Sequence, residues 1–156
     1  MNQNLPFEVL RQLRAQGKTL ATAESCTGGL IGKLLTDVPG SSEVYMGGVI
    51  SYTNGVKHRL PGVSEDTLRV YTAVSRQTAH EMARGAREAV RADVGVSVTG
   101  LAGPDGDGTG RPIGLVYIGI DMEGFSFSQE LHLTGDRAAI REQAAEAVLN
   151  LILEYA

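Results

Sequence analysis

The feature of this sequence that most constrains its fold is a strand-like run that passes directly into a helical pattern through small residues. Residues 19–24 favour an extended strand, Ser-Cys-Thr-Gly-Gly follows at residues 25–29, and the helical pattern begins near Gly28. In α/β proteins such a junction places hydroxyl groups and backbone N–H groups at the carboxyl edge of the sheet. We expect the N–H groups of the first helical turn to stabilise a phosphate or a developing oxyanion there. Ser25 directly precedes these donors, although a hydroxyl here also suits a simple helix cap.

Strand and helix patterns alternate along the rest of the chain. Helical patterns cover residues 64–70 and 75–90, and a last helix opens after Thr134. Residues 122–124 form too short a link for anything but a hairpin, so one strand must be antiparallel. Together these patterns predict one domain over residues 1–156, an α/β fold with a three-layer α/β/α sandwich on a mixed, mostly parallel sheet of about five strands. The other strands are expected at residues 44–52, 94–99, 114–121 and 125–133.

Three local patterns give further expectations. The first helical pattern has an apolar face that we predict to be buried, and it consists of Phe7, Val9, Leu10 and Leu13. Two adjacent glycines at residues 47–48 indicate a bulge or a close approach inside the second strand. Residues 54–63 are rich in turn-forming residues and are predicted to form a loop, in which three consecutive basic residues also suit a solvated face.

Composition limits the classes of partner. The chain has 14 Lys and Arg against 18 Asp and Glu, and this net charge of −4 without a basic run argues against nucleic acid. A single cysteine and the absence of a leader or a long apolar span predict a cytoplasmic protein with no membrane partner. No His, Cys and carboxylate set has ligand spacing, so we expect neither a metal nor another cofactor. Asp105 and Asp107 faintly suggest a calcium loop, but the required Glu spacing is missing.

Polar residues at the strand ends suggest a chemistry. Ser25, Lys57 and Thr99 should converge if the first three strands are parallel. A serine beside a lysine can hydrolyse an amide, because the lysine accepts the hydroxyl proton, the alkoxide attacks, and backbone donors hold the oxyanion. A glycine-rich loop at residues 100–110 offers unhindered N–H groups to an anionic or polar ligand. His80 falls off its helix's apolar stripe and is expected at the surface.

Five segments resemble the CinA C-terminal domain family. They are residues 22–29, residues 51–54 with Lys57, residues 73–75, residues 98–106 and residues 135–137. Active members of that family are nicotinamide mononucleotide deamidases, which hydrolyse the carboxamide and release ammonia in pyridine-nucleotide recycling. The resemblance therefore implies Ser25 as nucleophile and Lys57 as general base. It also implies a small-molecule nucleotide as substrate, with Tyr52, Thr99 and Arg137 supporting substrate and charge. We further expect a homo-oligomer, and substrate-binding or supporting roles for Thr27, Gly28, Gly29, Gly100 and Gly103.

The sequence departs from the family pattern at three places: Thr72 replaces a usual glycine, residues 105–111 carry extra Gly and Asp, and Arg111 with Pro112 replaces the commoner lysine-proline. These changes bear on substrate fit more than on chemistry. We expect no counterpart of the amino-terminal molybdopterin-binding-like domain that family members often carry. The alternative to an enzyme is a non-catalytic nucleotide-binding or interaction module in competence or DNA-damage responses.

Three expectations about single residues follow. Ser25, not Cys26, should be the nucleophile, because no histidine or acidic partner is evidently placed to complete a Cys/His pair. Lys57 must have a depressed pKa, through burial or neighbouring positive charge, to act as a base. Arg137 should contact a negative group, either the substrate phosphate or a carboxylate that orders the site.

Overall fold

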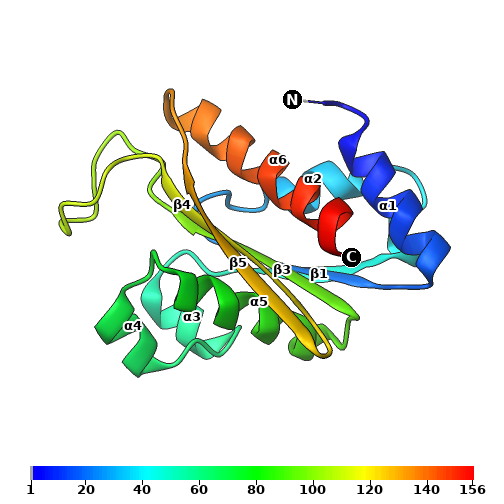
Figure 1. The fold of residues 1–156 in the computed structure, drawn as a ribbon, viewed down its shortest axis with the longest axis horizontal. Helices are drawn as coiled ribbons and strands as arrows, with labels where there is room; N and C mark the ends of the chain where they lie inside the picture. Colours follow the sequence, from blue (N-terminus) through cyan, green and yellow to red (C-terminus); the bar gives the residue numbers. More distant parts are fainter. Residues whose placement is uncertain (1) are drawn as a thin grey trace.

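The computed structural model describes residues 2–156 and contains one five-stranded sheet between two layers of helices (Figure 1). The strand order is β2-β1-β3-β4-β5. β1 pairs in parallel with β2 and β3, whereas β4 is antiparallel to both β3 and β5. The predicted α/β sandwich is therefore confirmed, and β4 is the one strand that runs against the others. The strands span Leu20–Glu24 (β1), Tyr45–Ile50 (β2), Val94–Gly100 (β3), Leu115–Met122 (β4) and Phe125–His132 (β5).

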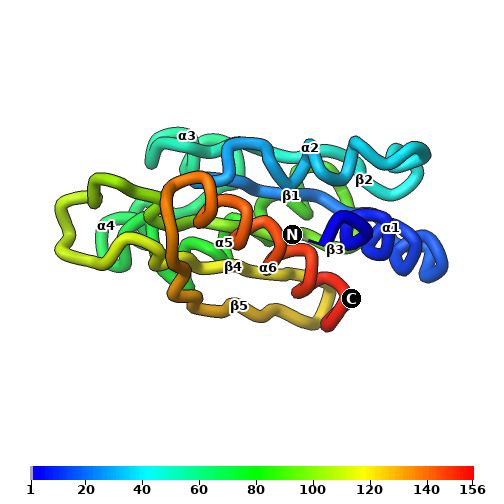
Figure 2. Tube along the Cα trace, turned by 90° about the horizontal axis from the view of Figure 1, so that it is seen from above, coloured from blue at the N-terminus to red at the C-terminus, as the bar shows by residue number. Residues whose placement is uncertain are grey.

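The helices divide evenly between the two faces of the sheet. One face is covered by α1 (Leu5–Gln16), α2 (Leu30–Thr36) and α6 (Arg137–Tyr155), and the other by α3 (Asn54–Arg59), α4 (Glu65–Tyr71) and α5 (Arg76–Val90) (Figure 1). A short 3₁₀ turn at Ser41–Glu43 precedes β2. Seen from above, β2 and β5 form the two edges of the sheet (Figure 2). Among residues 2–156, no helix combines the length and apolar character needed to span a bilayer.

The two helical layers pack against the sheet differently. The face under α1, α2 and α6 buries mostly large aliphatic side chains, which form the main core. On the other face α5 lies close to the sheet, because a Cβ added at Gly95 would come within 2.2 Å of the Ala83 carbonyl oxygen. Ala21 and Ala23 of β1 face the same helix layer, so small residues allow this close approach. The main-core side chains with no exposed surface include Val9, Leu13, Leu20, Ile31, Leu35, Val94, Val96, Val98, Val148 and Leu149.

Two sequence expectations need correction. Phe7 is 54% exposed, because it lies on the side of α1 opposite Val9, Leu10 and Leu13. Residues 54–59 are not a loop but helix α3, whose start is capped by the Thr53 side chain. Asn and Gly at its first two positions favour turns, which is why the sequence did not indicate this helix. The expectation for residues 47–48 is confirmed, since the register shifts after Tyr45 and a Cβ at Gly48 would lie 2.2 Å from Thr22 Oγ1.

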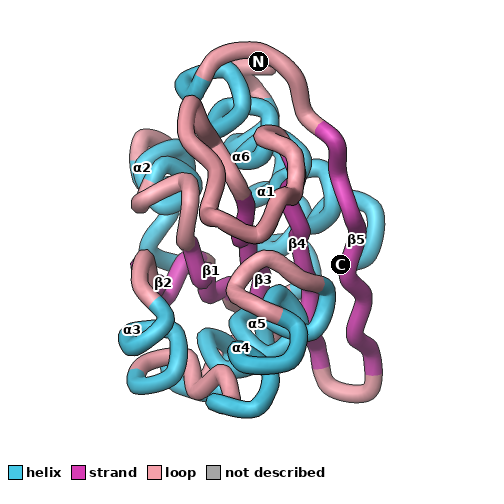
Figure 3. The backbone as a smooth tube through the Cα atoms, turned by 90° about the vertical axis from the view of Figure 1, so that its left-hand side faces the viewer, coloured by secondary structure: helices cyan, strands magenta, loops and turns pink. Residues whose placement is uncertain are grey.

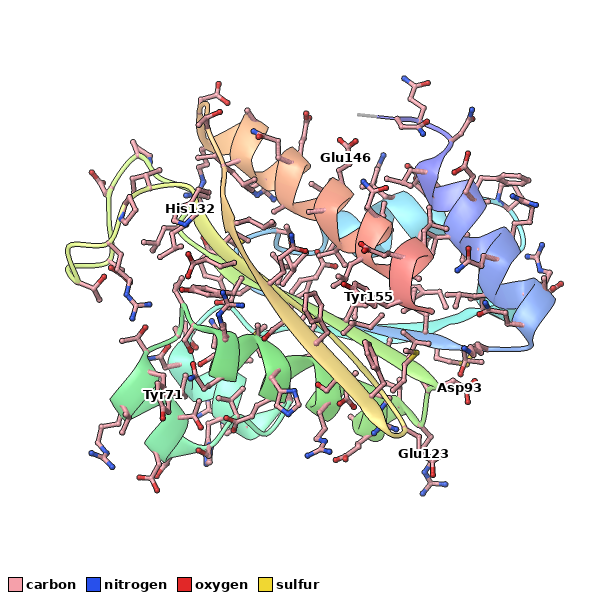
Figure 4. All side chains as sticks on the ribbon, in the orientation of Figure 1. Tyr71, Asp93, Glu123, His132, Glu146 and Tyr155 are labelled. Carbon is pink, nitrogen blue, oxygen red and sulfur yellow. The ribbon has the colours of Figure 1, made fainter. Side chains whose placement is uncertain are left out.

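The strand order creates a switch point beside β1. From β1 the chain passes to β2 on one side through α2, and later reaches β3 on the other side through α5. Ligands in open α/β sheets bind outside the carboxyl ends of strands at such a point. Loops gather at this end of the molecule (Figure 3). Figure 4 shows Tyr71 and His132 at this end, and Asp93 and Glu123 at the opposite end of the sheet.

Candidate active site

A cavity of about 350 Å³ opens at the carboxyl ends of β1 and β3. Seven of the sequence-predicted site residues line it: Ser25, Tyr52, Lys57, Thr99, Gly100, Gly103 and Arg137. Thr27, Gly28 and Gly29 do not line the cavity and lie behind the Ser25 turn. The rest of the lining consists of Cys26, Asn54, Ala73, Val74, Leu101, Ala102, Asp105, Gly106 and Asp107.

Ser25 and Lys57 meet although 32 residues separate them. Ser25 follows β1, and its backbone N–H continues the sheet by donating to the Val98 carbonyl at 3.0 Å. Lys57 projects from α3, and its Nζ lies 2.8 Å from Ser25 Oγ. Helix α3 thus places the Lys57 amine beside the hydroxyl of Ser25 at the end of β1.

The surroundings of Lys57 suit a neutral amine. Its side chain is 2% exposed, and Nζ also donates to the Ser51 carbonyl at 2.8 Å and the Tyr52 carbonyl at 3.3 Å. Burial lowers the pKa of Lys57 from 10.5 to about 8, and Cys26 acts in the opposite direction. Burial, rather than neighbouring positive charge, is therefore the cause of the depressed pKa. A neutral amine has two hydrogens for the two carbonyls and one lone pair for the Ser25 hydroxyl.

Cys26 is in a different state from its neighbour. The thiol is 5% exposed and belongs to the main hydrophobic core. Burial raises the pKa of Cys26 from 9.0 to about 11, so the thiol stays protonated near neutral pH. This environment is that of a small buried hydrophobe rather than of a reactive thiolate.

Glu24 controls the turn that follows β1, and sequence reasoning missed it. Its carboxylate accepts hydrogen bonds from the Thr27 hydroxyl at 2.6 Å and from the backbone N–H groups of Gly29, Ile31 and Gly32 at 3.2, 2.9 and 3.0 Å. The N–H groups expected to face a ligand at the start of α2 are therefore occupied, which corrects that expectation. A charged residue at the end of an otherwise apolar strand was the available signal.

Arg141 of α6 is the second contributor that the sequence did not reveal. It donates from Nε to the Cys26 carbonyl at 3.0 Å and from Nη2 to the Thr27 carbonyl at 2.9 Å. Its sequence neighbourhood gave no signal, because an arginine on a long amphipathic helix is usually solvated.

Arg137 joins two loops at the cavity mouth. It donates to the Gly103 carbonyl at 2.5 Å and to the Tyr52 hydroxyl at 2.8 Å. No carboxylate of residues 2–156 pairs with it, so the expected ordering carboxylate is wrong and only the phosphate alternative stays a prediction. The Thr99 hydroxyl donates to the Ala73 carbonyl at 2.7 Å.

The acidic residues of the cavity do not form a metal centre. Within residues 2–156 no group of three or more His, Cys, Asp or Glu side chains could hold a metal ion. Asp107 instead accepts hydrogen bonds from the backbone and hydroxyl of Thr109, and the hydroxyl bond lowers the pKa of Asp107. His80 is partly exposed and contacts Ser126, away from the cavity lining.

Known proteins match the chain along nearly its whole length. A nicotinamide-nucleotide amidohydrolase, PncC, of Enterobacter agglomerans is 48% identical over 90% of this chain and 87% of its own length. A CinA-like protein of Syntrophomonas wolfei is 44% identical over 99% of this chain. The chain spans only 37% of that relative and likewise 37% of a competence-damage relative from Halothermothrix orenii.

Solved structures share the fold closely. A CinA superfamily protein of Escherichia coli has a TM-score of 0.96 and 33% identity, covering 99% of this chain and 90% of that one. The competence/damage inducible protein CihA of Agrobacterium tumefaciens has a TM-score of 0.94 and 38% identity, covering 97% and 93%. The profile of the CinA C-terminal domain matches residues 2–156. This chain therefore belongs to the CinA C-terminal domain family.

Proposed function

We propose that this chain is an amidohydrolase that converts nicotinamide mononucleotide into nicotinate mononucleotide and ammonia. The observation that carries the proposal is the buried contact of 2.8 Å between Lys57 Nζ and Ser25 Oγ. The name of the Enterobacter agglomerans relative supports the substrate class. The cavity lining contains both signs of charge, which suits a zwitterionic molecule, and Arg137 is the side chain of the lining that would complement the phosphate.

The reaction begins with neutral Lys57. Its lone pair accepts the Ser25 hydroxyl proton while Ser25 Oγ attacks the carboxamide carbon. The C–N bond of the tetrahedral intermediate then breaks, and the Lys57 ammonium returns a proton so that ammonia leaves. The product of this half-reaction is an ester between the nicotinoyl group and Ser25.

Water completes the cycle. Lys57, neutral again, accepts a proton from water as the oxygen attacks the ester carbon, and the Ser25 oxygen leaves with a proton from Lys57. Nicotinate mononucleotide is released with Ser25 regenerated. Each step moves one proton between Lys57 and the reacting atoms, so these residues need no metal or organic cofactor for the bond changes.

Release of ammonia from nicotinamide mononucleotide tests the proposal. The wild type should produce ammonia and nicotinate mononucleotide in equal amounts. Ser25→Ala should lower kcat by roughly 10⁴-fold or more, because it removes the nucleophile. Cys26→Ala is the matched control one residue away and should keep most of the activity.

Two results would contradict the proposal. If Cys26→Ala lost activity and Ser25→Ala kept it, the nucleophile would be the thiol. If the wild type bound nicotinamide mononucleotide but released no ammonia, the non-catalytic nucleotide-binding module would be the better account. The names of several relatives mention competence and damage rather than a hydrolase.

A further inference from the structure

Two side chains of opposite charge hold the Ser25 turn from two sides. Glu24 takes up the N–H groups at the start of α2, as described above. Arg141 takes up the carbonyls of Cys26 and Thr27. The carbonyl of Ser25 itself accepts from the Gly28 N–H at 3.0 Å. Three successive carbonyls of the turn therefore each have a donor.

The same turn contains two backbone N–H groups without an oxygen acceptor in the described chain, and one of them, that of Cys26, belongs to a residue that lines the cavity. No oxygen among residues 2–156 accepts a hydrogen bond from the N–H of Cys26 or of Thr27. Both peptide groups are trans, because the one cis bond of the described chain is Gly103-Pro104. In a trans peptide the C=O and N–H point in opposite directions. Whatever fixes a carbonyl of this turn also fixes the N–H on the other side of the same peptide.

Arg141 fixes the direction of one of these donors directly. By holding the Cys26 carbonyl, it turns the Thr27 N–H away from α6. By holding the Thr27 carbonyl, it orients the peptide whose Gly28 N–H bonds to the Ser25 carbonyl, and that carbonyl belongs to the peptide of the Cys26 N–H. The Thr27 carbonyl also accepts from the Leu30 N–H at 3.1 Å, so Arg141 shares its hold on this part of the turn with the start of α2. Of the described residues, Arg141 is the one side chain that holds the carbonyls of both residues that follow the nucleophile.

We propose that Arg141 is a positioning residue that holds the Ser25 turn so that the backbone N–H of Cys26, a residue that lines the cavity, faces the oxyanion formed during Ser25 attack. This inference rests on the proposed amidohydrolase function. The donors expected from α2 are held by Glu24, which leaves the N–H that directly follows the nucleophile as the donor of this turn for the oxyanion. The positive charge of Arg141 also polarises the Thr27 carbonyl, which strengthens the Gly28 N–H as a donor to the Ser25 carbonyl and, through that carbonyl, the Cys26 N–H.

A lysine cannot replace this arginine fully. The guanidinium is a planar fork that presents two N–H groups in fixed directions, whereas an ammonium is a single point donor. Arg141→Lys should keep the charge and most packing but lose the simultaneous hold on two carbonyls. Its behaviour therefore separates a geometric role from a merely electrostatic one.

The first experiment measures hydrolysis of nicotinamide mononucleotide by Arg141→Ala and Arg141→Lys. Loss of the aimed donor should lower kcat by about 100-fold in Arg141→Ala, the usual effect of removing an oxyanion donor, while KM stays within about threefold. The kcat of Arg141→Lys should lie between those of the wild type and Arg141→Ala. Guanidinium ion added to Arg141→Ala should restore at least about tenfold of the lost rate, because it can bridge the same carbonyls.

The matched control is Arg14→Ala. Arg14 also donates from a helix to a loop carbonyl, that of Gly40, at 2.9 Å, but it lies away from the cavity lining. Arg14→Ala should keep kcat and should not respond to guanidinium. A kcat within threefold of wild type in Arg141→Ala would overturn the proposal. If Arg141→Ala does not fold, full activity of Arg141→Lys would overturn it equally.

A second readout does not depend on the proposed substrate. An alkyl fluorophosphonate forms a bond from Ser25 Oγ to phosphorus and expels fluoride, while Lys57 accepts the serine proton and the phosphoryl oxygen occupies the oxyanion position. Labelling, followed by intact mass, should be about 100-fold slower in Arg141→Ala than in wild type. Equal labelling rates would overturn the role of Arg141. Labelling of a wild type that leaves nicotinamide mononucleotide intact would instead reject the proposed substrate alone.

Discussion

The Ser25 turn and the loop at residues 101–114 form two walls of one cavity, and they are built in opposite ways. In the turn, Ser25 and Cys26 are nearly buried, and Glu24 and Arg141 occupy most of the backbone polar groups. In the loop, residues 104–110 are exposed, and the main attachments are Arg137 to the Gly103 carbonyl and Arg111 to the Val74 and Tyr71 carbonyls. The first wall is held by two side chains that bond to its backbone, whereas the exposed part of the second is attached mainly through two arginines at its ends.

This difference predicts that substitutions in the first wall act on the chemical step, and substitutions in the second act on substrate binding. The largest effect on the chemical step is expected at Lys57, whose amine contacts Ser25 of the turn. The effects should decrease from Lys57 through Glu24 and Arg137 to the exposed aspartates of the loop.

Lys57→Arg should cause the largest loss. Arginine keeps the charge but cannot release a proton near neutral pH, so kcat should fall by at least about 1,000-fold. The measurement is ammonia release from nicotinamide mononucleotide, with folding checked by thermal unfolding. Lys33→Arg, an exposed lysine on α2 paired with Asp37, is the control and should be fully active. More than about a tenth of wild-type activity in Lys57→Arg would mean that proton transfer contributes less than ~1.4 kcal/mol.

Glu24→Gln should have the next largest effect. The amide cannot accept from all four donors that Glu24 binds, so the turn shifts, and a misplacement of about 1 Å costs about 100-fold in kcat. Stability should also fall by roughly 2–3 kcal/mol, because bonds to a charged acceptor are lost.

The control for Glu24 is a buried carboxylate at the far end of the sheet. Asp121 has a side chain that is 2% exposed and pairs with Arg87 at 2.7 Å. Asp121→Asn should lower stability and leave kcat of the folded protein unchanged. If both variants lost stability but kept the kcat of the wild type, Glu24 would not affect the chemical step.

Arg137→Ala should act mainly on binding. Arg137 joins Tyr52 to the loop and is the expected phosphate contact, so kcat/KM should fall by about 10- to 100-fold, mostly through KM, as one charged hydrogen-bonding group is lost. Steady-state kinetics with nicotinamide mononucleotide give both constants. Arg76→Ala, an arginine that donates to the Ser128 carbonyl outside the cavity, is the matched control. An effect on kcat alone would show that Arg137 acts on the chemical step rather than on substrate binding.

Asp107→Gly should have the smallest effect. Asp107 is exposed and bonds within its own loop to Thr109, so kcat and KM should each change by no more than about threefold. The same kinetic assay measures it. A tenfold rise in KM would show that the carboxylate contacts the substrate and that the loop is more ordered than its few attachments imply.

The sequence predicted the helices and strands well where local patterns carried the information. The strand and helix alternation, the hairpin at residues 122–124 and the bulge near residues 47–48 all depend on neighbouring residues. The family motifs led to Ser25 and Lys57, but only the parallel pairing of β1 with β2 and β3 places these residues at one edge.

What the sequence could not predict depends on contacts between distant segments. Arg141 lies 115 residues from the carbonyl of Cys26, and no local pattern relates the two. Helix α3 is too short for its periodicity to outweigh Asn and Gly at its start. Thr72, noted only as a departure from glycine, has a φ of 72°, a conformation that favours glycine, and its carbonyl accepts from the hydroxyls of Ser75 and Thr78.

The pH dependence of kcat/KM for nicotinamide mononucleotide tests most directly whether neutral Lys57 activates Ser25. Burial puts the pKa of Lys57 at about 8, so the base form increases as the pH rises and is complete above that value. We predict that kcat/KM rises about tenfold per pH unit below pH 8 and levels off above it, and that the residual activity of Lys57→Arg lacks this limb. A wild-type profile that is flat between pH 6 and about 9, or a limb that persists in Lys57→Arg, would contradict the account.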